Sequence, residues 1–243
     1  MPLVHTIANA LDMSLYHGIR VVFFDAAGTL LHVPKGIGFH YSEVACRHGL
    51  EVSPATVQRA FGQAWVAAPT PESSRSRRPD DDRGWWQRLV YDVLVRCGAP
   101  ESIDHEALFA ELYSEFLKPG VWELYPEVKE VLETVRARYP IGIVSNFDGR
   151  LRVILEDLGI APLFDHWVIS SEVGADKPDR FIYECALEMA GIAPGEALHV
   201  GDDPAGDWEA AAAAGLQVYQ LDRPHNSLRE LLERLPVYEE RAV

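Results

Sequence analysis

Five short apolar runs constrain the fold of this 243-residue chain more than any other feature. The first, IRVVFFD (residues 19–25), is an unbroken series of β-branched and aromatic side chains that ends in an acid. Such runs are typical of strands that are covered on both faces of a parallel sheet. The four later runs are IGIVS (141–145), WVIS (167–170), ALHVG (197–201) and LQVYQL (216–221).

Helix-like segments separate these later runs. Each has apolar residues at three-to-four spacing and a Gly, Pro or Asp at its boundary. Regular alternation of strand and helix predicts right-handed crossovers and therefore an α/β fold with a doubly wound parallel sheet. The segments are PEVKEVLETVRARY, DGRLRVILEDLG, DRFIYECALEMAG and DWEAAAAAG.

Residues 33–121 break this alternation. They contain four or five helical patterns and no strand pattern, which predicts an all-helical insertion after the first strand. Within it, PTPESSRSRRPDDDRG (69–84) has the Pro, Ser and charge content of a solvated loop, and its basic run is balanced at once by acidic residues. The remaining divisions are an N-terminal arm at 1–18, with Met1 or Met13 as the start, and a core formed by 19–32 and 122–243.

The charge of the chain limits its partners. Thirty-seven acidic against 22 basic residues give a formal net charge of -15, which repels nucleic acid and anionic membranes. No apolar stretch approaches the roughly 18 residues of a membrane span. We therefore expect a cytoplasmic protein that binds neither nucleic acid nor membranes. We also expect it to be a monomer or a small homo-oligomer. An anionic small molecule stays compatible, because a divalent cation and buried basic groups can reverse the field inside a cleft.

Polar side chains follow four of the predicted strands. Asp25 ends the first and Ser145 with Asn146 the second, Lys177 follows the third, and Asp202, Asp203 and Asp207 follow the fourth. Ligands bind beyond the carboxyl ends of parallel strands, so these groups are predicted to share one cleft. Two carboxylates, a hydroxyl and a fixed ammonium suit phosphoryl transfer with Mg²⁺, which prefers oxygen ligands.

These motifs together resemble the haloacid dehalogenase-like (HAD) hydrolase superfamily. The resemblance runs from Ile19 to Leu235, and the placement of the insertion is similar to the helical cap of one branch of that superfamily. HYSEVACRHGLEVSP, GWWQRLV and SNFDGRL are similar to a poorly characterised group within it, the domain-containing protein 3 group. The residues that carry the superfamily resemblance are FFDAAGTL, IVSNFD, SSEVGADKPDRFIY and HVGDDPAGDWEAAAAAG.

The resemblance implies a role for each polar side chain. Asp25 would form a covalent intermediate, Ser145 and Asn146 would bind the transferring group, and Lys177 would neutralise it and orient Asp25. The substrate would be a small phosphorylated molecule that is enclosed by the cap.

The resemblance also implies a Mg²⁺ site. Its ligands would be Asp25, the backbone carbonyl of Ala27 and Asp202, with Asp203 as a ligand or an outer group. Three further residues would support the site without binding the reacting atoms: Gly28, Thr29 and Asp207.

Ala27 departs from the family pattern. Phosphatases of this type have Asp-x-Asp, and the second Asp protonates the leaving group and later activates water, a contribution of typically about 10² to 10⁴ in rate. This chain has Asp-Ala-Ala. The change is compatible with a phosphatase that is restricted to good leaving groups or takes an acid from the cap, for which His40, Tyr41, Glu43 and His48 are the candidates.

Ala27 is also compatible with two functions that need no acid at this position. A dehalogenase needs none because halide leaves unprotonated, but it also needs no Mg²⁺ and would not require the acidic cluster; a phosphonatase variant would need a cap lysine. A binding or scaffold protein could keep the fold and the metal pocket without turnover. In each of these cases we expect Trp85 and Trp86 to anchor the cap and His199 to be structural.

Overall fold

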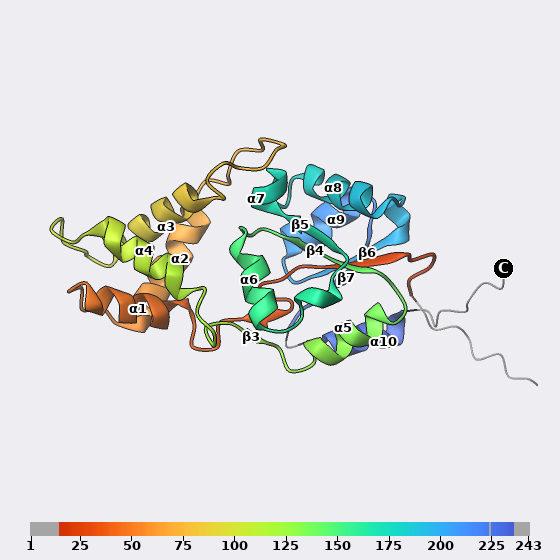
Figure 1. The fold of residues 1–243 in the computed structure, drawn as a ribbon, viewed down its shortest axis with the longest axis horizontal. Coiled ribbons are helices and arrows are strands. Elements are labelled where there is room, and N and C mark those ends of the chain that lie inside the picture. Colours follow the sequence, from red (N-terminus) through yellow and green to blue (C-terminus); the bar gives the residue numbers. More distant parts are fainter. Residues whose placement is uncertain (1–14, 224, 236–243) are drawn as a thin grey trace, which may run out of the picture.

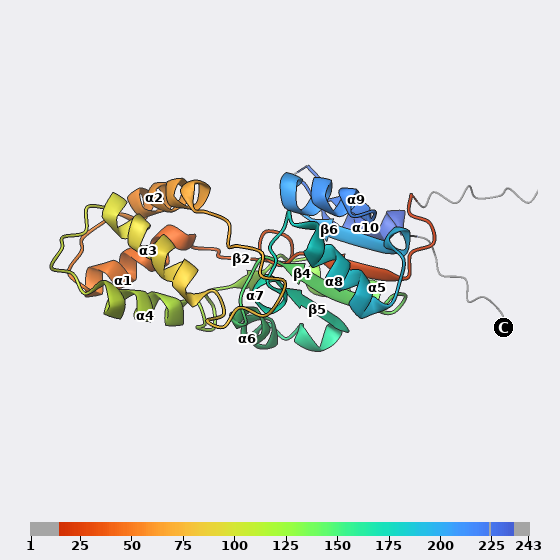
Figure 2. The same ribbon diagram turned by 90° about the horizontal axis from the view of Figure 1, so that it is seen from above.

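The structure is a computed structural model that describes residues 15–223 and 225–235. It is elongated, with a core that contains a sheet at one end and a group of helices at the other (Figures 1 and 2). The predicted N-terminal arm lies mostly outside the described residues. Tyr16, from its last part, lies against the core, and its hydroxyl donates to the carbonyl oxygen of Val218 at 3.2 Å.

The core sheet has five parallel strands in the order β5-β4-β1-β6-β7, which confirms the predicted α/β fold. β1 is central, and its Phe23 pairs with Gly142 on one side and with His199 on the other. A side chain at Gly142 would lie 2.7 Å from the Phe23 ring, so this Gly lets the ring pack on the sheet. The strands are Val21–Phe24 (β1), Ile141–Ser145 (β4), His166–Ile169 (β5), Ala197–Gly201 (β6) and Gln217–Gln220 (β7).

Helices cover both faces of this sheet (Figure 1). Alternate residues of β1 point to opposite faces, so Phe24 packs in one apolar cluster and Phe23 in the other. The first cluster includes α5 (Val128–Arg136), α6 (Arg150–Asp157) and α10 (Leu228–Arg234). The second includes α8 (Arg180–Ala190) and α9 (Ala210–Ala213), and α7 (Ser170–Val173) follows β5.

The inserted helices form a separate layer with an apolar core of their own. Val44, Val93 and Leu108 are fully buried within it. A two-stranded ribbon of β2 (Leu31–His32) and β3 (Glu123–Leu124) joins this cap to the core. The cap helices are α1 (Ile37–Arg47), α2 (Pro54–Ala67), α3 (Arg83–Arg96) and α4 (His105–Glu115). None of the helices in the described ranges is long and apolar enough to cross a membrane.

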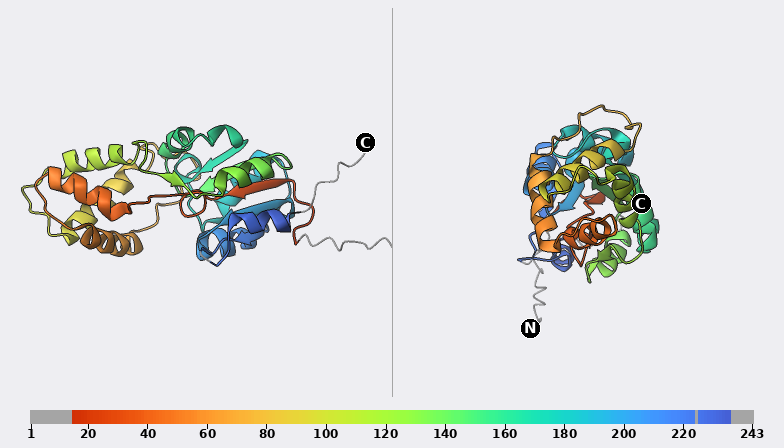
Figure 3. Two further views of the ribbon diagram at one scale, coloured as in Figure 1. Left: turned by 90° about the horizontal axis from the view of Figure 1, so that it is seen from below. Right: turned by 90° about the vertical axis from the view of Figure 1, so that its left-hand side faces the viewer.

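The 69–84 segment is exposed over most of its length, as predicted for a solvated loop, but Arg78 and Asp82 are buried. Figures 1 and 3 show this segment reaching from α2 back to the core beside α7. The amide of Ser74 donates to the carbonyl of Gly174 at 2.9 Å, and the amide of Arg78 donates to the carbonyl of Ser171 at 2.8 Å. Any side chain at Gly174 would clash with the backbone of Ser76, so the two segments approach as closely as Gly allows.

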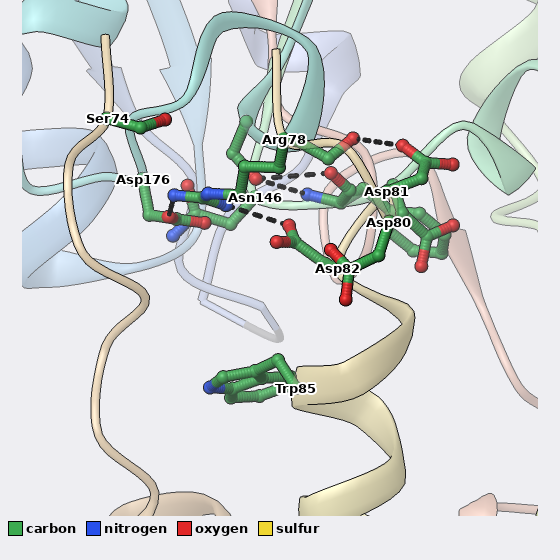
Figure 4. Close-up of polar contacts among 12 residues, drawn as sticks. Ser74, Arg78, Asp80, Asp81, Asp82, Trp85, Asn146 and Asp176 are labelled. Atoms are coloured by element: carbon green, nitrogen blue, oxygen red, sulfur yellow. Dashed lines mark hydrogen bonds and ion pairs between the residues drawn. The ribbon is translucent and has the colours of Figure 1, made fainter. Parts of the chain in front are cut away.

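Charged side chains of this segment form hydrogen bonds and ion pairs with the core (Figure 4). The Arg78 guanidinium donates to Asp82 at 2.7 Å and to Asp176 of the core, and all three side chains are buried. The Asp81 carboxylate accepts from the Ser171 hydroxyl at 2.6 Å and from the Gly149 amide, at the start of α6, at 2.9 Å. We call residues 74–82 the clasp, because they fasten the cap to the core.

Removing the Asp81 carboxylate should loosen the clasp. Asp81→Ala leaves the Gly149 amide and the Ser171 hydroxyl without their acceptor, which should lower the free energy of unfolding by about 1–3 kcal/mol. Cleavage by a protease within 69–84 should become faster at the same time. Glu72→Ala, an exposed acid in the same segment, is the control and should change neither quantity. Equal proteolysis of both variants and the parent would contradict the assignment.

Candidate active site

Three charged side chains meet at the carboxyl end of the sheet. Asp25 directly follows β1, where its amide donates to the carbonyl of Val200 at 2.9 Å. The Lys177 ammonium donates to Asp25 Oδ1 and to Asp207 Oδ1, both at 2.6 Å. All three side chains are buried, so the two carboxylates and the ammonium compensate one another away from water.

Asp207 is itself held on several sides. It lies in the π-helical turn Pro204–Glu209, and its second oxygen accepts from the Asp203 amide at 3.0 Å. The His199 Nε2 atom, on β6, lies 2.9 Å from Asp207 Oδ1. His199 is fully buried and packs edge-on against Tyr183, in line with the predicted structural role. A side chain at Gly201 would clash with the Asp207 carboxylate, which explains a Gly at the end of this strand.

Asp202 is positioned by the turn after β1. The Thr29 hydroxyl donates to Asp202 Oδ1 at 2.8 Å, and Thr29 is fully buried. Gly28 has a φ of +94°, and any side chain there would clash with the Asp202 carboxylate. Thus two of the three residues that were predicted to support the site lie against the same acid, Thr29 through a hydrogen bond and Gly28 by leaving space.

The carboxylates form a compact cluster that could hold a cation. Asp25, Asp202 and Asp207 offer oxygens that lie within 4.8 Å of one another. Burial, opposed by Lys177, raises the pKa of Asp25, and burial together with Asp25 raises the pKa of Asp202 to about 6. Both shifts arise mainly from burial, which disfavours the ionised carboxylates. Three carboxylates gather around one ammonium here, and a set of hard oxygen ligands of this kind fits Mg²⁺.

For Lys177 the surroundings favour the charged form. Burial alone would lower the pKa of its ammonium, but Asp25 and Asp207 together raise that pKa above its ordinary value. For Asp207, burial is outweighed by Lys177 and His199, so that its pKa is held below the usual range. The ammonium is therefore a fixed positive charge beside Asp25.

Two of the predicted site residues already have hydrogen-bond partners within the protein. The Asn146 amide, predicted to bind substrate, braces Lys177: its Nδ2 donates to the Lys177 carbonyl at 2.9 Å, and its Oδ1 accepts from the Lys177 amide at 2.6 Å. The Asp203 carboxylate, predicted as a ligand or an outer group, accepts from the Gly206 amide at 2.7 Å. Ser145 is buried at the end of β4, next to β1, and Ala27 is exposed in the turn after β1.

A cavity of about 260 Å³ lies beside this cluster, between core and cap. Asn146, Lys177 and Asp203 contribute to its core side. The sequence analysis missed most of its other residues, because they belong to the end of α2, the 69–84 segment and α3, whose side-chain directions depend on how the cap docks. The remaining lining residues are Trp65, Ala68, Thr70, Pro71, Asp82, Trp85, Trp86, Phe147, Ser170 and Asp176.

The four candidate acids of the cap are not among these lining residues. His40 Nδ1 lies 3.2 Å from Glu115, and His48 Nε2 lies 2.8 Å from Glu111, so both tie α1 to α4. Tyr41 is buried in the apolar core of the cap, and Glu43 is exposed. Within the described residues, the only acid that the cap contributes to the cavity is Asp82, and Arg78 pairs with it.

Comparison with known proteins decides the family. A family model described as haloacid dehalogenase-like hydrolase matches residues 19–215. The chain belongs to the haloacid dehalogenase-like hydrolase family. This confirms the resemblance inferred from the motifs, and the cluster around Asp25 is accordingly the candidate active site of a hydrolase.

Individual relatives agree with this assignment. The haloacid dehalogenase-like hydrolase domain-containing protein 3 of Danio rerio is 33% identical over 208 residues, which cover 84% of this chain and 86% of the relative. A HAD phosphatase from Thermococcus onnurineus has a similar fold, with a TM-score of 0.60 at 22% identity over 88% of this chain and 96% of its own. A defluorinating L-2-haloacid dehalogenase gives a TM-score of 0.70 at 25% identity, covering 91% of this chain and 89% of the dehalogenase.

Replacing Gly28 tests the close approach to Asp202. Gly28→Ala imposes a strained backbone and also displaces the half-buried Asp202 carboxylate, so we expect the free energy of unfolding to fall by about 2–4 kcal/mol. Gly49→Ala is the matched control, because Gly49 has a φ of +83° but no atom within 4 Å of the added methyl group. For Gly49→Ala the free energy of unfolding should fall only by the cost of backbone strain, about 1 kcal/mol. Equal losses in chemical denaturation would show that the approach to Asp202 is unimportant.

Proposed function

We propose that this hydrolase is a Mg²⁺-dependent phosphatase that acts on a small phosphorylated metabolite through an aspartyl phosphate on Asp25. The observation that carries the proposal is the position of Lys177, 2.6 Å from both Asp25 and Asp207, beside a cluster of carboxylates. We further propose that it is cytoplasmic and acts as a monomer or small homo-oligomer. The proposal keeps the cap as residues 33–121 and the core as 19–32 and 122–243.

Asp25 would be the nucleophile. One of its oxygens attacks phosphorus, the bond from phosphorus to the leaving oxygen breaks, and the leaving group takes the electron pair. The Lys177 ammonium, 2.6 Å from Asp25 Oδ1, would hold the carboxylate in a fixed orientation for the attack. The Lys177 ammonium and the buried Ser145 hydroxyl would bind the phosphoryl oxygens as charge moves onto them.

Asp25, Asp202 and the Ala27 carbonyl would hold Mg²⁺, with Asp207 close enough to contribute. The ion would supply the positive charge that the ionised carboxylates lack and would offset the repulsion between Asp25 and the incoming phosphate. Asp203 is better suited to an outer position, since its carboxylate already caps the following turn. Gly28 and Thr29 would keep Asp202 in place.

Ala27 limits the reaction. No side chain at this position can protonate the leaving oxygen, and none can take the proton of the water that later attacks the aspartyl phosphate. The second step releases inorganic phosphate and a proton, and it restores the Asp25 carboxylate. The first step therefore favours a substrate whose leaving group is stable as an anion, whereas the second step is the same for every substrate and would be slow with all of them.

The rival functions receive less support. Dehalogenation would leave the cluster of three carboxylates without a purpose, although the fold is shared with a dehalogenase. A phosphonatase needs a cap lysine in the site, and among the described lining residues Lys177 of the core is the only lysine. A scaffold without turnover would not require the compensated arrangement of Asp25, Lys177 and Asp207.

A series of phosphate esters graded by leaving-group pKa tests the role of Ala27. The parent should hydrolyse them with a steep dependence on that pKa, and only with Mg²⁺ present. Ala27→Asp adds a carboxyl group at an exposed position and should flatten the dependence, with a gain of about 10² to 10⁴ in kcat/KM for alkyl phosphates. Asp25→Asn should be inactive on every ester.

Three contrary results would each point to a different function or a different acid. Metal-independent release of halide from 2-haloacids would assign the site to dehalogenation. Absence of any turnover, together with thermal stabilisation by phosphate compounds, would favour the scaffold. A flat dependence on leaving-group pKa in the parent would mean that another group replaces the acid at position 27.

The missing base should also expose the covalent intermediate. With 4-nitrophenyl phosphate the first step needs no acid, so we expect the second step to limit the rate and the phosphoenzyme to accumulate. Rapid mixing should therefore give a burst of nitrophenolate close to one equivalent per active site. Ala27→Asp should abolish the burst by accelerating the second step, and a linear time course in the parent would contradict a slow second step.

A further inference from the structure

The cap side of the cavity is a wall of three tryptophans. Trp65 comes from α2, and Trp85 and Trp86 come from the start of α3. The rings of Trp65 and Trp85 meet edge to face with centroids 5.6 Å apart, and those of Trp85 and Trp86 do so at 5.0 Å. The Trp85 indole donates to the carbonyl of Pro69 at 2.8 Å, which fixes its orientation.

This wall is larger than the packing of the cap requires. Trp85 and Trp86 pack partly against the apolar core of the cap, in line with the role predicted for them, but Trp65 is 49% exposed. Figure 4 shows the Trp85 ring across a gap from Asn146 and Asp176 of the core. All three rings line the same cavity as Lys177.

The polar lining adds a restriction on charge. Asp82, Asp176 and Asp203 all line the cavity, and Lys177 is the only basic side chain among its described lining residues. Arg78 neutralises part of this charge, but its guanidinium is engaged by Asp82 and Asp176. Lys177 is already shared between Asp25 and Asp207. No cation of the described lining is left to pair with a second anionic group on a substrate.

Two independent features thus describe the same leaving group. Ala27 requires a leaving group that departs as a stable anion, and the cavity offers the faces and edges of three indole rings without a spare cation. A phenol, an alcohol whose oxygen is attached directly to an aromatic ring, meets both conditions. Its ring stacks on indole, and the same ring delocalises the negative charge of its oxygen.

We propose that the substrate is a phosphate monoester of an aromatic alcohol that carries no second negative charge, with its ring bound by Trp65, Trp85 and Trp86. This rests on the proposed function, in which Lys177 receives the phosphate. It excludes small phosphorylated carboxylic acids as good substrates.

Phosphonates that cannot be hydrolysed separate ring recognition from leaving-group chemistry. In calorimetric titrations with Mg²⁺, benzylphosphonate should bind about three- to tenfold more tightly than cyclohexylmethylphosphonate, which has similar bulk but no aromatic face. Within a second matched pair, 4-carbamoylbenzylphosphonate should bind about tenfold more tightly than 4-carboxybenzylphosphonate, because the carboxylate meets an acidic lining.

Substitutions locate the effect. Trp65→Leu should reduce the preference for the aromatic phosphonate to less than about twofold, whereas Trp65→Phe should keep it. Tyr91→Leu removes an exposed aromatic side chain of α3 that lies outside this cavity, and it should leave the preference unchanged.

The outcomes distinguish the two proposals. Equal affinity for benzylphosphonate and cyclohexylmethylphosphonate, or no binding of either, overturns the aromatic substrate even if the protein hydrolyses phosphate esters. Selective binding of benzylphosphonate with no hydrolysis of any ester supports the aromatic site and overturns the phosphatase. An unchanged preference in Trp65→Leu would place the recognition elsewhere and also overturn the inference.

Discussion

The site depends on one buried cation placed between two carboxylates. Lys177 reaches Asp25, directly after β1, and Asp207, in the turn after β6, so a single ammonium links the ends of two neighbouring strands. Without it, two desolvated carboxylates would repel each other, a situation that typically costs about 3–5 kcal/mol when one partner of a buried pair is removed. Other residues hold Lys177 and Asp207 in place: Asn146 hydrogen-bonds the Lys177 backbone, and His199 contacts the Asp207 carboxylate.

A second constraint acts at the other side of the cavity. The cap has its own apolar core and a short ribbon to the sheet, so its position relative to Asp25 is set by few contacts. The clasp supplies polar ones, through Asp81 on the start of α6 and Arg78 on Asp176. Because Asp82 also begins α3, the same turn fixes the direction of the helix that carries Trp85. The clasp therefore positions both the cap and the helix that carries Trp85.

The sequence predicted the core well because its pattern is local. IRVVFFD can only be a buried strand, and a polar residue after such a strand must lie at the edge where ligands bind, so Asp25, Lys177 and Asp202 were found by position alone. The detailed partners were less accessible. Nothing local distinguishes an Asn that binds substrate from one that braces a lysine, as Asn146 does. The contacts of the clasp were not predicted, because a segment rich in Pro, Ser and charged residues is expected to be solvated. Arg78 and Asp81 instead bind groups of the core that lie about 70 to 100 positions away in the chain.

The position two residues after the nucleophile gains its meaning from this geometry. An ordinary acid there would protonate any alkoxide, and the cap would then be the sole source of selectivity. Under the proposed function, Ala27 would make the reaction itself reject poor leaving groups, and the cavity would add a preference for an aromatic ring without a second negative charge. Under the proposed function, Ala27 and the three tryptophans would act in the same direction. The enzyme would then use the stability of its leaving group in place of a proton donor.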